Sequence, residues 1–394
     1  MADPTELENR LPFAPLKIVA LDSAEQLGKV VNEYLVEFRK NTNTIFNSDP
    51  AFQGYHEDNF LMNVSVPRFS SGESKGLFNE TVRGKDLYIL VDVTNHSIPY
   101  EFYGITNYKS PDDHYADLKR VIAAAGGKAK RITVIMPFLY EGRQHKKNGR
   151  ESLDCAYALE ELTAMGVNNI VTFDAHDPRV QNAAPLSGFD NFMPTYQFLK
   201  ALLAQMPDLV IDKDHTMVIS PDEGALDRAI YFASVLNIDV GMFYKRRDFT
   251  KVVNGKNPIV AHEFLGDNIE GKDMIIVDDM ISSGESMLDT ARLLKEKKAG
   301  RVFICTTFGL FTNGMEAFDK AYEEGYFDLL ITTNVVYQPE ELLSRKYYVS
   351  ADMSKFLASI IDFLNHDVSL SYVRTPTEKI HAALERHMAS IQDN

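Results

Sequence analysis

Tryptophan is absent from this sequence of 394 residues, and cysteine occurs only at Cys155 and Cys305. The two cysteines form neither a CxxC pair nor a Cys/His zinc spacing, which excludes a disulfide framework and a thiolate metal site. No apolar run approaches the roughly 18 residues that a transmembrane helix needs, and the segment from Met1 to Leu11 is acidic and polar. We therefore expect a protein of a reducing, cytoplasmic compartment that is neither exported nor anchored.

Positive charge is also scarce, because 41 Lys and Arg residues stand against 56 Asp and Glu residues and the net charge is −15. A field of this sign repels nucleic acid and anionic membrane, so we expect neither as a partner. Any polyanionic ligand must then be held by local basic clusters. The sequence also lacks a GxxxxGK[ST] phosphate-binding loop. A nucleotide, if one binds, needs another recognition element.

Apolar runs rich in Val, Ile and Phe recur roughly every 30 to 40 residues, with segments of helical period between them. This alternation is typical of parallel α/β structure. Nine strands exceed one compact sheet, so we predict two α/β domains in tandem. The predicted strands are Lys17–Leu21, Leu87–Val93, Ile132–Pro137, Ile170–Asp174, Met217–Ser220, Val240–Tyr244, Met274–Asp278, Val302–Thr307 and Leu329–Thr332.

The domain boundary is less sharply marked than the fold class. Two segments have the composition of linkers, Asn182–Thr195 and Met206–His215, and we place the boundary near Pro207. The polar segments Asn41–Phe60 and Tyr100–Asp113 are predicted as insertions or loops. The predicted domains are residues 1–206, residues 207–350 and a C-terminal set of helices, residues 351–394, with the option of packing back on the first domain.

The sharpest chemical signal is the segment Met274–Ser286, in which a buried strand leads through two acids and a short hydroxyl-bearing turn into a helix. Free N–H groups at such a helix start, together with nearby hydroxyls, can cradle a phosphate monoester. The two acids can accept hydrogen bonds from vicinal hydroxyls or hold Mg²⁺ through water. A phosphate cradle next to two acids suits ribose 5-phosphate, which carries both a phosphate and vicinal hydroxyls. Its predicted ligand-binding residues are Asp278, Asp279, Ser282, Ser283, Gly284, Glu285 and Ser286.

This segment resembles the phosphoribosyl-diphosphate signature of the type I phosphoribosyltransferase fold. With further matches, the chain is similar to the ribose-phosphate pyrophosphokinase family over roughly Leu16 to Val373. The resemblance implies two phosphoribosyltransferase-like domains, each with a mainly parallel sheet flanked by helices. It also implies transfer of the diphosphoryl group of ATP to the 1-hydroxyl of ribose 5-phosphate, with Mg²⁺ as the metal, and a dimer-based homo-oligomer, such as a hexamer.

The same resemblance assigns roles to individual residues. Segment Phe69–Glu73 is similar to the family's adenine loop, Tyr140–Lys147 to its ATP segment, Asp174–His176 to its metal segment, Ser220–Gly224 to the segment whose aspartate meets the second metal or the sugar, and Lys245–Arg247 to the catalytic strand end. The residues implied are Phe69, Ser71, Glu73, Arg143 and Gln144 for ATP, His176 and Asp222 for metals, Asp222 also for ribose 5-phosphate, and Lys245 and Arg247 for catalysis.

Some positions depart from the family pattern, and other interpretations stay open. His145 replaces an acid that is common there, Ser71 and Gly72 replace an amide pair, and Glu141 with Gly142 lengthens the ATP segment by one residue. Two alternative functions follow: a non-catalytic homologue that binds ribose phosphate or nucleotide and regulates a partner enzyme, and a phosphoribosyltransferase acting on a nucleobase. Purely structural roles are the remaining alternative, since the paired acids could form only a turn and the basic runs could be surface residues that face solvent.

Overall fold

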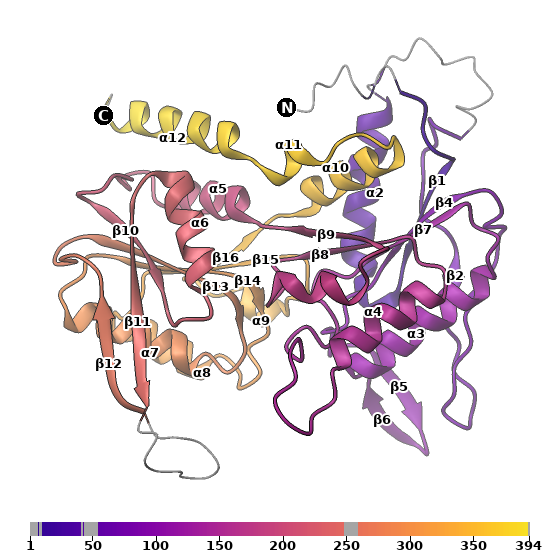
Figure 1. Cartoon of the computed structure of the whole chain (residues 1–394), viewed down its shortest axis with the longest axis horizontal. Coiled ribbons are helices and arrows are strands. Elements are labelled where there is room, and N and C mark those ends of the chain that lie inside the picture. Colours follow the sequence, from indigo (N-terminus) through magenta and orange to yellow (C-terminus); the bar gives the residue numbers. More distant parts are fainter. Residues whose placement is uncertain (1–6, 8–9, 41, 43–53, 248–258, 393–394) are drawn as a thin grey trace. The chain divides into compact units, whose positions relative to one another are not determined.

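The computed structural model describes the chain except for residues 1–6, 8–9, 41, 43–53, 248–258 and 393–394 (Figure 1). The chain forms two compact units. The first unit comprises Met1–Met193, Asn334–Tyr337 and Asp352–Thr375. The second unit comprises Pro194–Thr333, Gln338–Ala351 and Pro376–Asn394.

The first unit is built on a five-stranded parallel sheet with the order β1-β4-β7-β8-β9. Its strands are β1 (Leu16–Ala20), β4 (Asp86–Leu90), β7 (Arg131–Ile135), β8 (Asn169–Phe173) and β9 (Gly188–Phe192). The central strands are buried along almost their whole length, as expected for a parallel sheet that is covered on both faces.

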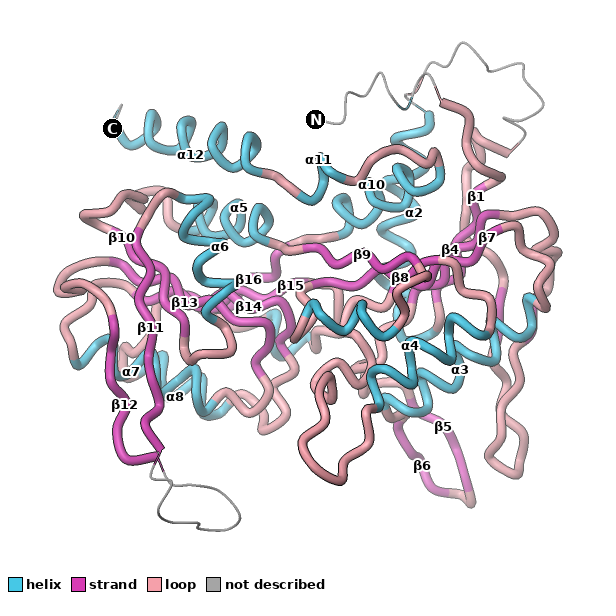
Figure 2. Tube along the Cα trace, in the orientation of Figure 1, coloured by secondary structure: helices cyan, strands magenta, loops and turns pink. Residues whose placement is uncertain are grey.

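Helices cover this sheet on both faces (Figures 1 and 2). Helices α3 (Pro111–Ala125) and α4 (Asp154–Ala164) share one apolar core with alternate residues of the strands. Helices α2 (Glu25–Lys40) and α10 (Ser354–Asn365) pack against each other, and α2 also contacts β1. The smaller elements are η1 (Asp22–Ala24), β2 (Val64–Ser65), β3 (Leu77–Phe78), β5 (Pro99–Phe102), β6 (Ile105–Tyr108), η3 (Pro178–Ala183) and α11 (Ser371–Arg374).

The second unit has a seven-stranded sheet with the order β12-β11-β10-β13-β14-β15-β16, in which β12 is antiparallel to β11. The strands are β10 (Thr216–Ser220), β11 (Asp239–Arg247), β12 (Ile259–Leu265), β13 (Asp273–Ile281), β14 (Val302–Gly309), β15 (Leu329–Thr333) and β16 (Tyr348–Ala351). One apolar core joins the sheet to α5 (Thr195–Gln205), α6 (Leu226–Leu236) and α12 (Thr377–Gln392). A second joins it to α7 (Glu285–Glu296), α8 (Glu316–Glu323) and α9 (Glu340–Leu343).

All nine predicted strands are present, and three further strands extend the two sheets. Strand β9 lies within Asn182–Thr195, so the interpretation of that whole segment as a linker was wrong. Its sequence, Gly-Phe-Asp-Asn-Phe, carries turn-forming residues, and it is an edge strand in which polar side chains are tolerated. The segment Tyr100–Asp113 is also more regular than expected, because β5 and β6 form a hairpin and α3 begins at Pro111. Most of Asn41–Phe60 lies outside the described residues.

The two compact units divide between Met193 and Pro194, whereas the sequence places the boundary near Pro207. The difference arises because α5 packs Phe198, Leu199 and Leu202 into a core of the second unit. The C-terminal region is shared, since residues Asp352–Thr375 belong to the first unit and Pro376–Asn394 to the second.

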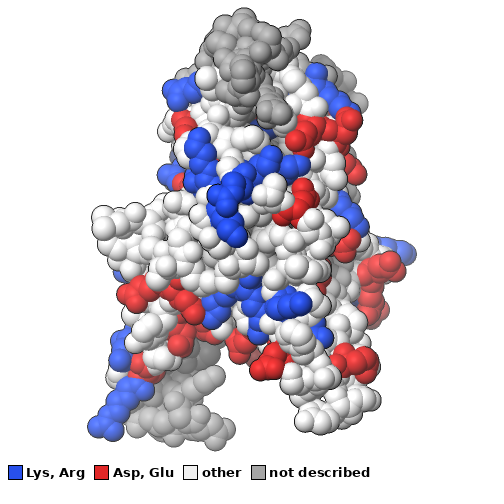
Figure 3. Space-filling model, turned by 90° about the vertical axis from the view of Figure 1, so that its right-hand side faces the viewer, with Lys and Arg blue, Asp and Glu red and all other residues white. Residues whose placement is uncertain are grey.

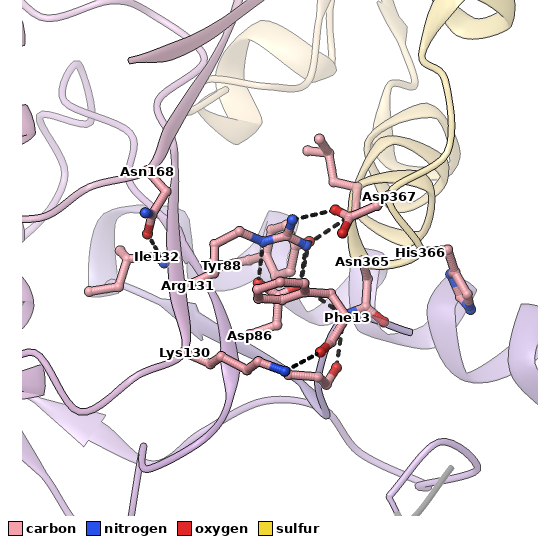
Figure 4. A network of polar contacts seen from close by, with 12 residues as sticks. Phe13, Asp86, Tyr88, Lys130, Arg131, Ile132, Asn168, Asn365, His366 and Asp367 are labelled. Atoms are coloured by element: carbon pink, nitrogen blue, oxygen red, sulfur yellow. Dashed lines mark hydrogen bonds and ion pairs between the residues drawn. The ribbon is translucent and has the colours of Figure 1, made fainter. Parts of the chain in front are cut away.

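Buried polar groups hold the C-terminal segment of the first unit against its sheet (Figure 4). Arg131 on β7 donates to both carboxylate oxygens of the fully buried Asp86, at 2.8 and 2.7 Å, and also to the Leu364 carbonyl at 2.7 Å. Asn365 Nδ2 donates to Asp86 Oδ2 at 2.8 Å. The end of α10 is thereby fixed to two neighbouring strands by charge-assisted hydrogen bonds.

A second buried pair, Arg39 and Asp362, joins α2 to α10. Arg39 Nη2 lies 2.9 Å from Asp362 Oδ1 and 2.7 Å from Asn365 Oδ1. The guanidinium also lies over the rings of Tyr55 and Phe60, at 4.5 and 5.0 Å from their centroids. Arg39 is only 1% exposed, so these partners replace its hydration shell.

Over the described residues, the structure contains no helix of the length and apolar character that crossing a bilayer requires.

Candidate functional site

The loop after β13 forms a sharp entry into α7. Gly284 precedes the helix with φ 86°, a left-handed conformation that an L-residue with a side chain rarely adopts. A Cβ at this position would lie 2.4 Å from two ring carbons of the buried Phe318. Glycine is therefore required both by the backbone conformation and by the space. The first-turn N–H groups of α7 face the preceding loop and have no side-chain cap from Gly284, which gives the loop the properties of an anion site.

The side chains of the loop are accessible to a ligand. Ser282 and Ser283 are half-buried, and Ser286 is exposed in the first turn of α7. Glu285, which would repel a phosphate if its carboxylate faced inward, is an exposed residue. The Ser282 carbonyl accepts a hydrogen bond from Thr312 N at 2.9 Å, which fixes the loop to the segment after β14. The sequence thus predicted this strand, loop and helix correctly as local structure.

Asp278 and Asp279 lie inside β13 and not at its end, because the strand continues to Ile281. Asp279 N donates to Asp278 Oδ1 at 2.8 Å, and Asp279 is buried. Arg228 on α6 faces the pair, with Nη1 3.5 Å from Asp278 Oδ1 and Nη2 4.0 Å from Asp279 Oδ2. Sequence reasoning did not identify Arg228, which stands on an amphipathic helix and in none of the motifs.

The pKa of Asp278 is raised well above its ordinary value, first by burial and then by the neighbouring charge of Asp279, while Arg228 acts in the opposite direction. The neutral form of Asp278 is therefore favoured in the folded chain relative to an exposed aspartate. Carboxylates of this kind can bind a divalent cation or accept hydrogen bonds from the hydroxyl groups of a sugar.

We expect Asp278→Asn to raise the free energy of unfolding of the second unit at neutral pH by about 0.5–2 kcal/mol, the range typical of a single stabilising substitution. The native state binds the Asp278 proton more tightly than the unfolded state, so ionisation at neutral pH destabilises the fold. The gain should shrink as the pH falls below the raised pKa and Asp278 itself becomes protonated. Denaturation at several pH values measures this.

Asp267→Asn, on an exposed loop of the same unit, is the matched control and should leave stability unchanged. A variant Asp278→Asn that is less stable than the wild type at neutral pH would contradict the assignment of unfavourable charge to this pair.

Asp222 and the basic residues of β11 belong to the same edge of the second sheet. Asp222 follows β10, and its Oδ1 accepts hydrogen bonds from Gly224 N at 2.9 Å and Ala225 N at 3.3 Å. Strands β10, β11 and β13 are neighbours and parallel, so their carboxyl ends meet at one edge. Such edges are the usual ligand sites of α/β sheets. Lys245 and Arg247 close β11, but their side chains lie outside what the structure describes.

In the first unit, the predicted adenine loop is a tight exposed turn. Phe69 N donates to the Glu73 carbonyl at 2.7 Å, and Gly72 N donates to the Phe69 carbonyl at 2.9 Å. Ser71 Oγ donates to Glu73 Oε2 at 2.6 Å. Phe69 is 53% exposed, so its ring is available for stacking on a planar ligand.

The predicted ATP segment follows β7. Arg143 is exposed, whereas Gln144 is tied to the chain, since its Nε2 donates to the Ser152 carbonyl at 2.8 Å. Glu141, which with Gly142 lengthens this segment by one residue relative to the family, has φ 57°. Burial, followed by the charges of Asp154 and Asp112, raises its pKa. Because Arg143 is exposed and the Gln144 amide is hydrogen-bonded within the chain, Arg143 is the more accessible of the two to a phosphate ligand.

His176, the predicted metal ligand, follows β8 and is exposed. The structure brings His145 next to it, with the two ring centroids 5.3 Å apart. His145 Nε2 lies 3.5 Å from Asp177 Oδ2, and a hydrogen bond from Arg179 is the main cause that lowers the pKa of Asp177 to about 2. From the sequence, His145 was identified only as a departure from the family pattern. Its position beside His176 was not predicted.

Among the described residues, no group of three or more His, Cys, Asp and Glu side chains is arranged to hold an ion. A structural metal of the zinc type does not fit such a donor set. Mg²⁺ fits, because it keeps several waters and is often held by one or two carboxylates and the substrate phosphates. Asp278 and Asp279 offer two neighbouring carboxylates of the kind that such a site uses.

Comparisons with known proteins agree with this architecture. Residues 16–166 match the model for the N-terminal domain of ribose phosphate pyrophosphokinase, and residues 191–345 match the phosphoribosyl transferase domain. The ribose-phosphate pyrophosphokinase of Mycoplasma pneumoniae is 31% identical over 278 residues, which cover 70% of this chain and 76% of that protein. The chain belongs to the ribose-phosphate pyrophosphokinase family. The Mycoplasma genitalium enzyme of the same name is 29% identical over 327 residues, covering 82% of this chain and 87% of that protein.

A solved structure shows the same fold for this member of the ribose-phosphate pyrophosphokinase family. The phosphoribosylpyrophosphate synthetase from Mycobacterium smegmatis superposes with a TM-score of 0.69 and 22% identity, covering 90% of this chain and 99% of that one. The predicted family, a family of transferases, and the predicted pair of phosphoribosyltransferase-like domains are therefore confirmed, and synthesis of phosphoribosyl diphosphate is supported as the main interpretation. The roles of individual residues stay predictions.

Proposed function

We propose that this chain is a ribose-phosphate diphosphokinase, which transfers the diphosphoryl group of ATP to the 1-hydroxyl of ribose 5-phosphate and releases AMP. The observation that carries the proposal is the loop Ser282–Ser286 at the start of α7, preceded by the acid pair on β13, in a chain of this family. A phosphate group and a sugar hydroxyl pair are the two ends of the ligand that such a site would take.

Residues of the second unit would bind the ribose phosphate. The backbone N–H groups of the loop, with the hydroxyls of Ser282, Ser283 and Ser286, would hold the 5-phosphate, and Gly284 allows the close approach of the backbone. Asp278 and Asp279 would accept hydrogen bonds from the ribose hydroxyls. Asp222 would orient the sugar or share its carboxylate with a metal ion.

Residues of the first unit would bind ATP. Phe69 would stack on the adenine, while the Ser71 hydroxyl would donate or accept a hydrogen bond at the base edge and the Glu73 carboxylate would accept one. Arg143 would pair with phosphate oxygens as a two-pronged donor, and Gln144 would hold the segment in place. On the face shown in Figure 3, lysine and arginine side chains stand in small groups among acidic ones, as expected if cations are placed locally.

Mg²⁺ would neutralise charge on the ATP phosphates when bound. His176 is the proposed metal ligand of the first unit, and Asp222 is the proposed ligand of a second metal ion in the second unit. During transfer, the 1-oxygen of the sugar forms a bond to the β-phosphorus, and the bond from that phosphorus to the oxygen of the departing AMP breaks. Lys245, Arg247 and Arg143 would stabilise the negative charge that develops there. The sugar hydroxyl proton goes to solvent or to a phosphate oxygen, because no side chain is assigned as general base. We further propose a cytoplasmic, dimer-based homo-oligomer.

The direct test is incubation of the purified full chain with ATP, ribose 5-phosphate and Mg²⁺, followed by quantification of AMP. AMP formed in equal amount to phosphoribosyl diphosphate, and only when the sugar phosphate is present, supports the proposal. No AMP, with ligand binding intact, would favour the non-catalytic regulator. Diphosphate released from phosphoribosyl diphosphate only when a nucleobase is added would favour a phosphoribosyltransferase.

Lys245→Ala is expected to lower kcat by about 10²-fold to 10³-fold, the usual effect of removing one fixed donor from a developing charge. Because the interaction is assigned to the transition state, KM for both substrates should change little. Steady-state assays give both constants. Lys298→Ala, on the exposed surface of the same unit, is the control, and normal turnover by Lys245→Ala would exclude the assigned role.

A further inference from the structure

The hairpin β5–β6 projects from the first unit beyond α3 (Figure 1), and the proposed function gives it no part. Its inner side lies against the loop that carries Phe69. The guanidinium carbon of Arg68 is 3.9 Å from the centroid of the Tyr100 ring on β5. Gly72 has φ 94°, and a Cβ there would lie 2.8 Å from a ring carbon of Phe102. The hairpin therefore contacts both ends of this short loop.

Arg68 is the residue at which three elements meet. Its Nη1 donates to the Gly72 carbonyl at 2.7 Å and so closes the loop from within. Its Nη2 lies 3.3 Å from Asp113 Oδ1 in the first turn of α3. Asp113 is itself fixed, because it forms a capping box with Ser110. The side chain of Arg68 is 17% exposed, so its contacts are formed mostly out of water, where a stacked and hydrogen-bonded guanidinium is strongest.

The side chains that would meet the base lie outside this support. Phe69 is 53% exposed and Glu73 is also exposed, so neither is held in place by burial of its own side chain. Their backbone is held by the Phe69 to Glu73 hydrogen bond and by the isolated bridge between Arg68 and Ser74. A loop of this kind is ordered before its ligand arrives only if its base is fixed.

We propose that Arg68 is a positioning residue, which the hairpin β5–β6 holds in place so that Phe69 and Glu73 are preorganised for the nucleobase of ATP. The inference rests on the proposed binding of ATP at this loop and deepens it. Arg68 touches no reacting atom in this role. Its loss should therefore weaken nucleotide binding and base discrimination while leaving the use of ribose 5-phosphate unchanged.

The test compares the full-length wild type with Arg68→Ala, Arg68→Lys, Tyr100→Ala and Tyr100→Phe. We expect Arg68→Ala to weaken binding of a non-hydrolysable ATP analogue, measured by calorimetry, by about 10-fold to 100-fold, since its lost hydrogen bonds are charged ones. Arg68→Lys should rescue only part of this, because lysine lacks the planar fork. Tyr100→Ala should bind the ATP analogue about threefold to tenfold more weakly than the wild type. Tyr100→Phe, which keeps the ring, should bind it with wild-type affinity.

Kinetic constants distinguish positioning from general damage. KM for ATP should rise in Arg68→Ala, KM for ribose 5-phosphate should not, and the preference for ATP over GTP should fall. Arg83→Ala, on the exposed surface of the same unit, is the charge control. If Arg68→Ala does not fold, the pair Tyr100→Ala and Tyr100→Phe decides, because its members differ only in the ring that Arg68 covers.

Any of three results would overturn the inference. Folded Arg68→Ala could bind the ATP analogue with wild-type affinity, or Tyr100→Phe could lose as much affinity as Tyr100→Ala. The third result is a rise in KM for ribose 5-phosphate in Arg68→Ala that equals the rise in KM for ATP. These outcomes leave the proposed function standing, provided that the wild type binds the analogue and forms AMP. A wild type that neither binds the analogue nor forms AMP would overturn both.

Discussion

Asp362→Ala should lower the free energy of unfolding of the first unit by about 3–5 kcal/mol, the usual effect of removing one partner of a buried ion pair. The variant leaves the Arg39 guanidinium, 1% exposed, without its carboxylate. The Asn365 carbonyl oxygen and the rings of Tyr55 and Phe60 remain, but none of them carries a negative charge. The desolvated cation is thus the reason for the size of the effect.

Hydrogen exchange of the amides in α2 and α10 measures this loss within the first unit. Asp362→Asn keeps a hydrogen-bond acceptor for Arg39 and should therefore lose less stability than Asp362→Ala. The double variant Arg39→Met with Asp362→Leu removes both charges and should recover much of the stability. Asp58→Ala removes an exposed partner of Lys40 and is the control, which should leave exchange unchanged. If Asp362→Ala reduced the protection of these amides no more than the control does, the pair Arg39 and Asp362 would not be what stabilises the contact between α2 and α10.

The strands were predictable because each central strand is a short apolar run, which a parallel sheet with helices on both faces requires. Strand β9 was missed for the opposite reason, since Asp190 and Asn191 are polar and an edge strand needs no apolar face on both sides. The return of Asp352–Thr375 to the first unit could not be derived from a pattern. It depends on partners such as Arg39 and Asp362, which are 323 positions apart in the sequence.

The same distinction applies to the site. The segment from Asp278 to Ser286 was predictable because its strand, loop and helix are contiguous, so local rules fix their order. Arg228 was not, because only the packing of α6 beside β10 and β13 brings it to the acid pair. Arg68 was also missed, since its contacts come from a hairpin and a helix that follow the loop by about 30 to 45 residues.

Gly284→Ala is the change that most directly tests the phosphate site. The alanine must adopt φ 86°, which costs about 1–2 kcal/mol for a left-handed residue with a side chain. Its Cβ also meets the ring of Phe318, and forcing a methyl group into a packed core costs about 1–3 kcal/mol. Phe318 is fully buried and contacts the rings of Phe311 and Phe327, so it has little room to move.

The backbone of the loop is therefore expected to shift in Gly284→Ala, and the N–H groups that would hold the 5-phosphate shift with it. We expect the Kd for ribose 5-phosphate, measured by calorimetry, to rise at least about 100-fold, which corresponds to roughly 2.7 kcal/mol of the combined penalty. Gly271→Ala is the matched control, because Gly271 lies outside the loop but has φ 80° in the same unit, with no atom within 4 Å of its added Cβ. It should lower stability without changing the affinity. If Gly284→Ala instead bound ribose 5-phosphate as tightly as the wild type, the loop before α7 could not be the cradle, since a ligand held by those N–H groups must respond to their displacement.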